Sequence, residues 1–230
     1  MKKKAITAAE LMAELQDNPE YLRSKEIAEQ KRLQINDEIL FEVKPILQEL
    51  DAEGFSVENV DQLILKYAPI PKQIVNILMP WLLKIKNKNL LEMIVRAIGT
   101  TREKYNGVFL TQLFEQSESE ILQWTISNTI AESRPENIEN WLFNKINDDS
   151  LGMPKQMLFI AAARLLVKEK ALEFFKEHFD EAPGHVAPAL GEIGSGEELQ
   201  FLGTKESEYN KGWVAKEIRK AMKKIEKRLK

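Results

Sequence analysis

The sequence of 230 residues contains no cysteine and only two histidines. Without cysteine, a disulfide framework, a thiol nucleophile, an iron–sulfur cluster and a thiolate zinc site are all excluded. No run of 18 apolar residues occurs, so no segment of the sequence is expected to span a membrane. The net charge is −3, whereas dedicated nucleic-acid-binding domains typically have a strong excess of basic residues.

The first residues, Met1 to Ile6, are basic like the start of a signal peptide. Glu10 and Glu14 interrupt the apolar stretch that such a signal needs, so we expect a cytoplasmic protein. With 43% hydrophobic residues, a chain of this length can bury enough apolar surface to fold without a disulfide or a metal ion.

The motifs of the common catalytic sites are missing as well. No serine lies in a Gly-x-Ser-x-Gly elbow, and residues 194–197 (GlySerGlyGlu) neither follow a strand nor have the lysine of a P-loop. His178 and His185 have acidic neighbours, but Pro183 and Gly184 break the chain between them, so no helix side presents both to a metal ion. The sequence therefore predicts no enzyme activity, no cofactor and no metal site.

What the sequence does have is helical periodicity. Apolar residues recur three and four positions apart, and nowhere do β-branched residues alternate with polar ones as in a strand. In several places a first helix is followed by a second one that is strongly apolar on one side. Landmark residues of these second helices are Leu91, Leu122, Leu158, Val186 and Val214, spaced 31, 36, 28 and 28 residues apart. This spacing indicates a repeat of helix pairs.

The clearest unit of the repeat is AlaLeuGlyGluIleGlySerGlyGlu at residues 189–197. Its apolar residues share one side of a helix. Gly191 removes a side chain where a neighbouring helix can approach, Gly194 is expected to end the helix with a positive φ, and Ser195 is expected to cap the next helix. ArgAlaIleGlyThr at residues 96–100 repeats the arrangement of small residue, large residue and glycine.

This string resembles the second helix of a HEAT repeat, particularly the short bacterial HEAT-like form of PBS-lyase-type repeats. The resemblance extends over roughly residues 70–225 and implies an all-α fold, a right-handed α-solenoid of HEAT-like helical hairpins with an N-terminal helical cap. Residues 1–55 would form the cap, and residues 56–230 the HEAT-like repeat domain, continuous with the cap as one domain. In such families the second helices line a curved inner surface that generally binds other proteins.

The segment from Pro19 to Leu50 predicts one long or broken helix, bent at Pro45. Residues 22–38 are charged, whereas the later half carries an apolar stripe. We interpret the charged half as a solvated helix side; the alternative is an arm that grips a partner or a second copy of the chain.

The sequence has four tryptophans, which matter because a second HEAT-like family, the alkylpurine DNA glycosylases, holds tryptophans and an aspartate close together on a concave helical surface. Here no aspartate follows Trp124 before Asp148, so that cluster is not reproduced and the resemblance is one of fold. We interpret the tryptophans as packing residues. Alternatively, Trp124 and Asn128, one turn apart, line an exposed groove.

Two further features are candidates for binding. Arg164 lies at the edge of the apolar side of its helix, where HEAT-like stacks often hold an arginine in a salt bridge between repeats; ligand contact is the alternative. Residues 211–230 have a local charge of +7, whereas residues 169–210 have −7. Opposite the apolar stripe of the last helix are Lys216, Lys220, Lys223 and Lys227. We interpret this lysine side as a solubilising end cap, or else as a surface for an acidic protein, a nucleic-acid backbone or an anionic lipid.

These observations predict a non-enzymatic protein–protein interaction module or adaptor, a scaffold whose partner is another protein. The alternative is a nucleic-acid-binding protein or a relative of the HEAT-like DNA glycosylases.

Overall fold

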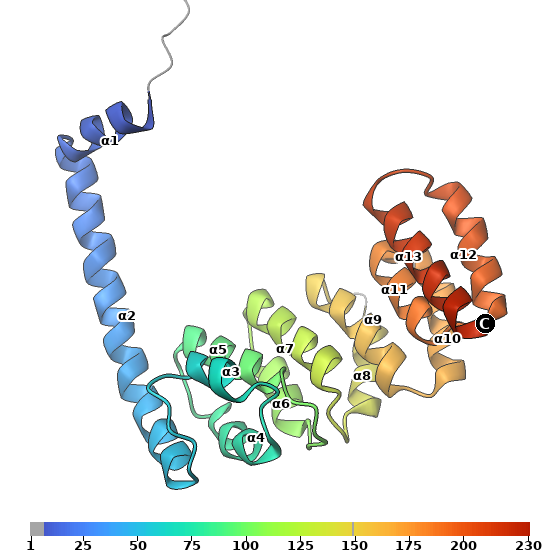
Figure 1. Ribbon diagram of the computed structural model, residues 1–230, viewed down its shortest axis with the longest axis horizontal. Coiled ribbons are helices and arrows are strands. Elements are labelled where there is room, and N and C mark those ends of the chain that lie inside the picture. The colour runs from blue at the N-terminus through green and yellow to red at the C-terminus, as the bar shows by residue number, and fades with distance from the viewer. Residues whose placement is uncertain (1–6, 149) are drawn as a thin grey trace, which may run out of the picture. The chain divides into compact units, whose positions relative to one another are not determined.

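The computed structural model describes residues 7–148 and 150–230, and all regular structure within them is helical (Figure 1). An isolated bridge between Asn106 and Glu136 is the one β-type pairing in these ranges. No helix there is both long enough and apolar enough to cross a membrane. The all-α fold class predicted from the sequence is therefore confirmed. In chain order the helices are α1 (Ala8–Gln16), α2 (Pro19–Ala52), α3 (Asp61–Tyr67), α4 (Lys72–Leu78), η1 (Met79–Trp81), α5 (Lys88–Ile98), α6 (Val108–Gln116), α7 (Glu120–Ser133), α8 (Glu139–Ile146), α9 (Met153–Leu165), α10 (Lys168–Glu177), η2 (Phe179–Glu181), α11 (Pro183–Ile193), α12 (Gly196–Glu208) and α13 (Gly212–Leu229).

The chain divides into two compact units, Met1–Lys44 and Pro45–Lys230. The division falls inside α2, which continues through Pro45, and therefore lies before the boundary predicted at residue 55. The described side chains of the smaller unit are mostly exposed. The repeat predicted from the sequence, and all of the candidate binding residues, belong to the larger unit.

In the larger unit the odd-numbered helices from α5 to α13 pack in chain order, each against the next (Figure 1). The landmark residues of the predicted second helices lie on these same helices. Each odd-numbered helix also packs against the even-numbered helix that precedes it, from α4 with α5 to α12 with α13. The predicted order of first and second helices is therefore present in the larger unit.

Neighbouring odd-numbered helices run parallel. At the start of α9 the backbone N–H of Met153 donates to the Glu120 carboxylate at the start of α7, at 3.1 Å. At the other end, Arg164 Nη1 of α9 donates to the carbonyl of Ala131 of α7, at 2.7 Å. Parallel packing brings the carboxyl-terminal ends of these helices to the same edge, where their unpaired carbonyls concentrate partial negative charge.

Gly191 and Gly194, in the segment of residues 189–197, allow neighbouring atoms to pack closely against the backbone. A Cβ on Gly191 would lie 2.9 Å from the Cα of Ala221, so the approach of α13 to α11 that the sequence predicted is confirmed. Gly194 has a φ of −63°, so the predicted positive φ is wrong. Glycine is needed at this position for space instead, because a Cβ there would lie 2.6 Å from the Leu190 carbonyl oxygen and 2.8 Å from the Glu198 Cβ.

Ser195 caps α12 in a capping box with Glu198, as predicted. The backbone N–H and the hydroxyl of Ser195 donate to Glu198 Oε2 at 2.7 and 2.8 Å, and Lys176 Nζ lies 3.4 Å from Oε1. The Glu198 side chain is only 2% exposed. Burial alone would raise the pKa of this carboxyl, but the hydrogen bonds from Ser195 and Lys176 outweigh it and hold the pKa below its ordinary value.

A matched pair of glycine substitutions tests the close packing. Gly191→Ala should lower the free energy of unfolding by about 1–3 kcal/mol, because its methyl group meets the backbone of α13. Gly203→Ala, on α12, has room for its methyl group and should raise stability by about 0.5–1 kcal/mol through helix propensity. Urea unfolding measures both. Equal effects of the two substitutions would show that α11 and α13 are not in close contact.

Glu198→Gln tests the capping box through its pH dependence. Because the folded-state pKa of Glu198 is lowered, its carboxylate stabilises the fold above the unfolded-state pKa of about 4.3, and this stabilisation is lost as the pH falls through the folded-state value. We expect Glu198→Gln to cost about 1–3 kcal/mol at pH 7 and the difference from wild type to shrink below about pH 4. Urea unfolding between pH 3 and 7 measures it, with the exposed Glu226→Gln as control; a difference that does not change with pH would contradict the assignment.

Candidate functional site

One side of α7 remains uncovered by neighbouring helices. Ile121, Trp124, Asn128 and Glu132 are spaced three and four residues apart on it. Ile121 is 61% exposed, and Trp124 and Asn128 are half-buried. The two predicted groove residues therefore lie together on an accessible helix side.

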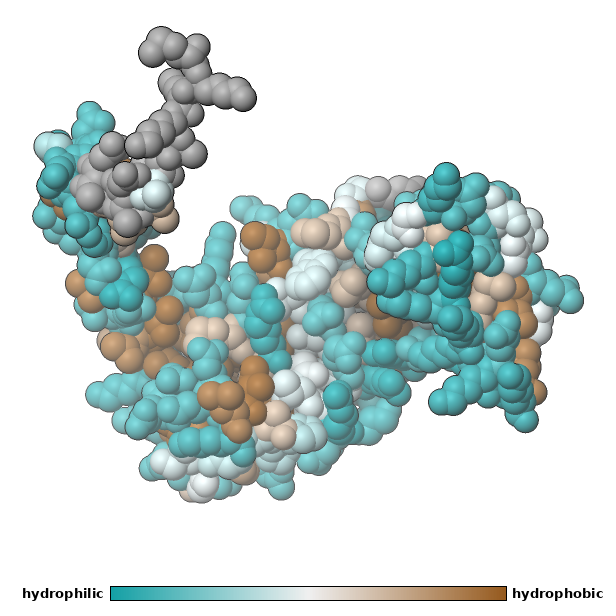
Figure 2. All heavy atoms as spheres, turned by 45° about the horizontal axis from the view of Figure 1, so that its top comes forward, coloured by the Kyte–Doolittle hydropathy of each residue, from teal (hydrophilic) through white to brown (hydrophobic). Residues whose placement is uncertain are grey.

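The corresponding side of α9 carries Met153, Met157 and Ile160, followed by Arg164. Met153 is exposed, and the other three are half-buried. Because α7 and α9 are parallel and joined at both ends, their uncovered sides lie next to each other in the same register. We call this surface the α7–α9 strip; it consists of Ile121, Trp124, Asn128, Met153, Met157 and Ile160. Hydrophobic side chains reach the surface of the larger unit among hydrophilic ones (Figure 2).

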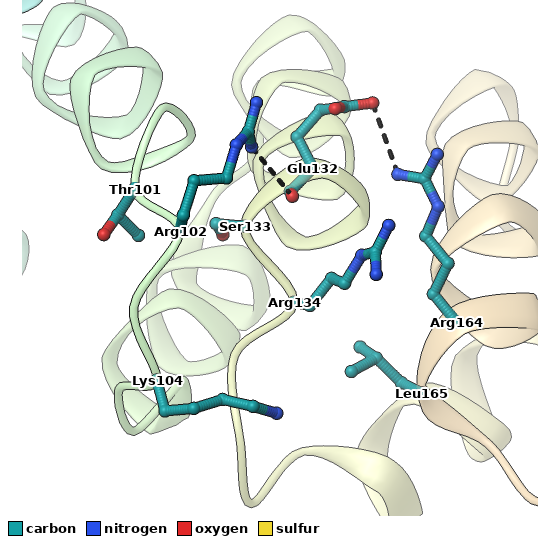
Figure 3. Close-up of a pocket in the computed structure, with 8 residues that line it drawn as sticks. All are labelled: Thr101, Arg102, Lys104, Glu132, Ser133, Arg134, Arg164 and Leu165. Carbon is teal, nitrogen blue, oxygen red and sulfur yellow. Dashed lines mark hydrogen bonds and ion pairs between the residues drawn. The ribbon is translucent and has the colours of Figure 1, made fainter. Parts of the chain in front are cut away.

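A cavity of about 440 Å³ lies at the carboxyl-terminal end of this strip (Figure 3). It is formed where the loop after α5 meets the ends of α7 and α9. We call it the basic pocket, because four of its eight lining residues are cationic and one is anionic. The lining residues are Thr101, Arg102, Lys104, Glu132, Ser133, Arg134, Arg164 and Leu165.

Carbonyls and carboxylates of the chain hold two of the pocket arginines. Arg102 Nη1 donates to the backbone carbonyl of Glu132 at 3.5 Å. Arg164 Nη1 donates to the carbonyl of Ala131 at 2.7 Å and lies 3.4 Å from the Glu132 carboxylate, while Nη2 lies 3.3 Å from the carboxylate of Glu192 on α11. Arg164 therefore joins three successive odd-numbered helices, as the predicted inter-repeat salt bridge requires. Its contacts come from these two nitrogens, since Nε is buried without a partner among the described residues.

Arg134 differs from the other two arginines. It ends α7 in the left-handed region, with a φ of 53°, a place where helices usually have glycine or asparagine. Its guanidinium forms no hydrogen bond or ion pair with any residue that the structure describes. Lys104, in contrast, lies 3.6 Å from the exposed carboxylate of Glu136. In Figure 3 the side chains of Arg134 and Lys104 both extend toward the α9 side of the pocket.

Carboxylates from outside the lining pair with two of the pocket cations, Glu136 with Lys104 and Glu192 with Arg164. Glu103 accepts a hydrogen bond from the backbone of Lys72 at 3.0 Å, and Glu136 faces Lys104. Glu192 lies 2.6 Å from Lys224. Partial burial alone would raise the pKa of Glu192, but Lys224 and Arg164 outweigh it and lower the pKa below its ordinary value, so the carboxylate is charged near neutral pH.

The sequence pointed to only one residue of the pocket, Arg164. A usable signal was nevertheless present: Arg102, Arg134 and Arg164 are 32 and 30 residues apart, close to the period of the helix pairs. Each arginine follows, or ends, the second helix of its pair. The three arginines do not share one position relative to their helices, since Arg102 lies four residues after the end of α5, Arg134 directly after α7, and Arg164 within the last turn of α9. Their spacing near the period still places all three close to the ends of neighbouring helices.

The predicted lysine side belongs to α13, at the end of the row of helices. Ala215, Ile218, Ala221 and Ile225 are buried against α11 and α12, so the opposite side faces solvent as predicted. All four predicted lysines of that side are exposed; they are Lys216, Lys220, Lys223 and Lys227. Lys220 pairs with Glu217 of the same helix at 2.7 Å.

The two histidines have separate surroundings. His178 stacks on Phe174 with ring centroids 4.3 Å apart and hydrogen-bonds to Glu181. His185 makes an edge contact with Trp213, with centroids 5.2 Å apart. In residues 7–148 and 150–230 no group of histidine and acidic side chains is arranged to hold a metal ion. The structure thus does not bring the His178–His185 stretch together as a site.

Comparisons with protein-family models, with curated proteins and with solved structures find no match to this chain.

Substitution of Arg164 tests its role between the helices. Arg164→Met keeps most of the apolar stem but removes the donors, and should lower the free energy of unfolding by about 1–3 kcal/mol. Loss of the guanidinium should also raise the pKa of Glu192, which Arg164 lowers in the wild type. Urea unfolding and a carboxyl-carbon NMR titration measure the two effects. Arg96→Met removes an exposed pair with Glu92 and should change stability by less than about 1 kcal/mol; similar losses in both variants would argue against the bridging role.

Proposed function

We propose that residues 56–230 form a right-handed HEAT-like α-solenoid and that the chain is a cytoplasmic, non-enzymatic interaction module or adaptor. In this proposal the α7–α9 strip binds another protein. The observation that carries it is the parallel packing of the odd-numbered helices, each paired with the helix before it. Repeat proteins use such stacks to present extended binding surfaces, because each unit contacts only its neighbours and leaves one side of its helices free.

The composition of the strip supports a protein partner. Its centre combines an aromatic residue, Trp124, with the flexible side chains of Met153 and Met157. Aromatic residues and methionine are enriched at protein interfaces, where tryptophan often contributes a large share of the binding energy. Methionine also adapts its shape to a partner at small cost. Exposed apolar residues scattered singly are ordinary, whereas grouped ones mark interaction sites, and the strip groups its apolar residues on two adjacent helices.

The second candidate is a nucleic-acid-binding protein, or a relative of the HEAT-like DNA glycosylases. The exposed lysines of α13 favour it, because a row of cations on one helix side can neutralise successive phosphates. The net charge of −3 favours the first candidate instead, since the cations of α13 are balanced by the acidic residues before them.

Trp124→Ala tests the role of the strip. We expect it to weaken the affinity of the chain for its stoichiometric protein partner about tenfold or more, because a half-buried tryptophan at the centre of an interface is a typical hot spot. The partner is obtained by affinity capture with the full chain from its native cells and is then titrated in purified form. Phe143→Ala, which removes an exposed aromatic residue of α8 outside the strip, is the matched control and should leave the affinity unchanged.

Equal affinities of the Trp124→Ala and Phe143→Ala variants would exclude the strip as the binding surface. Tight binding of duplex DNA, with an affinity that falls steeply as salt rises and that is lost in a Lys216→Glu/Lys223→Glu variant, would favour the second candidate.

A further inference from the structure

The basic pocket gathers positive charge from three separate segments of the chain. Arg102 and Lys104 come from the loop after α5, Arg134 from the end of α7, and Arg164 from the end of α9. With Glu132 as the one acidic lining residue, the lining has a formal charge of +3. Lys104 is paired with Glu136, and Arg164 with Glu132 and Glu192. The positive charge that an anion can neutralise is therefore mainly that of Arg102 and Arg134, which have no carboxylate partner among the described residues.

Two of the three pocket arginines are held in place before any ligand binds. The carbonyls at the end of α7 and the carboxylate of Glu132 fix Arg102 and Arg164, which therefore lose little freedom on binding. Arg134 has no partner of its own among the described residues, and its left-handed backbone would suit glycine better than arginine. The guanidinium of Arg134 is thus the donor group that the fold leaves available.

The charge and size of the pocket match a phosphate monoester better than a carboxylate. A phosphate monoester carries about −1.5 to −2 at pH 7 and offers three acceptor oxygens, whereas a carboxylate carries −1 and offers two. The planar donor fork of arginine binds phosphate oxygens in pairs. The cavity of about 440 Å³ also leaves room for the group that carries the phosphate.

The surroundings of the pocket favour a single phosphate over a nucleic-acid strand. Duplex DNA carries one negative charge for about every 1.7 Å of its axis, so a strand in the pocket would bring further phosphates next to it. There they would meet Glu136 and Glu192, whose carboxylates contact Lys104 and Arg164. A single anionic group inserted among the cations avoids this repulsion.

We propose that the basic pocket binds one phosphate monoester, and that its carrier is a phosphorylated serine or threonine of the protein partner. The identity of the carrier rests on the proposed function, whereas the pocket chemistry does not. A partner segment on the α7–α9 strip leads to the pocket, because Trp124 and Glu132 are eight residues apart on α7, or about 12 Å. An extended peptide covers this distance in about four residues.

The test uses the full chain with arginine side chains labelled with ¹⁵N. The probes are inorganic phosphate, O-phosphoserine, and a short peptide with a tryptophan four residues from a phosphoserine, together with its unphosphorylated and glutamate-substituted forms. We expect phosphate and phosphoserine to shift the Nε–Hε resonances of Arg102 and Arg134. The phosphopeptide should bind at least tenfold more tightly than phosphoserine, and at least tenfold more tightly than the glutamate peptide.

Arg134→Gly is the decisive variant, because glycine accepts a φ of 53° and the fold should be retained. It should weaken phosphopeptide binding at least tenfold, while Arg96→Ala, which removes an exposed arginine outside the pocket, leaves it unchanged. Circular dichroism and thermal unfolding confirm that both variants are folded.

Three outcomes would overturn the proposal. The first is that Arg134→Gly and wild type bind the phosphopeptide with equal affinity, and the second is that wild type binds the glutamate peptide as tightly as the phosphopeptide. The third is that a DNA oligonucleotide binds more tightly than the phosphopeptide and that its binding depends on Arg134. Phosphoserine binding without any gain from the peptide would overturn the partner protein as the carrier. The Trp124→Ala experiment tests the proposed function separately. If Trp124→Ala binds the partner as tightly as Phe143→Ala does, while Arg134→Gly still weakens phosphoserine binding, the proposed function is wrong and the pocket chemistry stands.

Discussion

The structure of the larger unit depends on the pairing of unsatisfied backbone carbonyls at the carboxyl-terminal ends of its parallel helices. The odd-numbered helices run side by side in one direction, so their carboxyl-terminal carbonyls, each with partial negative charge, gather at one edge. Arginines from neighbouring segments donate to these carbonyls. Arg102 and Arg164 bind the end of α7, and Arg228 of α13 binds the carbonyls of Gly191 and Glu192 at the end of α11 at 3.0 and 2.7 Å. Each contact satisfies an unpaired carbonyl and joins two helices at the same time.

Because arginines are needed to pair with these helix-end carbonyls, positive charge collects at this edge of the larger unit, where it can bind an anion. Two of the arginines that bind the end of α7, Arg102 and Arg164, come to lie in one pocket because both reach the same helix end. Arg102 and Arg164 are largely engaged by the chain, and their positions are fixed as a result. Arg134 is not engaged, so it adds charge and donors that the fold itself does not use. The arginines that pair with helix-end carbonyls thus also form part of a preorganised site for an anion.

Much of this fold could be predicted from the sequence, because its signals are local. Apolar spacing identified the second helices, and the string around Gly191 identified both a close helix approach and the cap at Ser195. The φ of Gly194 was predicted wrongly, since a glycine that is required for space looks the same in sequence as one that is required for a left-handed turn. The pocket could not be predicted from local signals, because its cations come from three segments about 30 residues apart. Arg102 and Arg134 become recognisable as counterparts of Arg164 only when the predicted helix pairs are aligned with one another.

The two basic surfaces of the larger unit differ in a way that separates their roles. The lysines of α13 are exposed, lie on the last helix of the row and have flexible, strongly hydrated side chains. Such residues suit a helix side that faces solvent, where hydrated cations keep the surface polar. Of the pocket arginines, Arg102 and Arg164 are anchored by hydrogen bonds, and Arg164 is also partly buried beside an apolar strip on the same helices. Recognition of a specific group requires donors that are already in position, so the pocket, and not the more strongly charged helix, is the better site for selective binding.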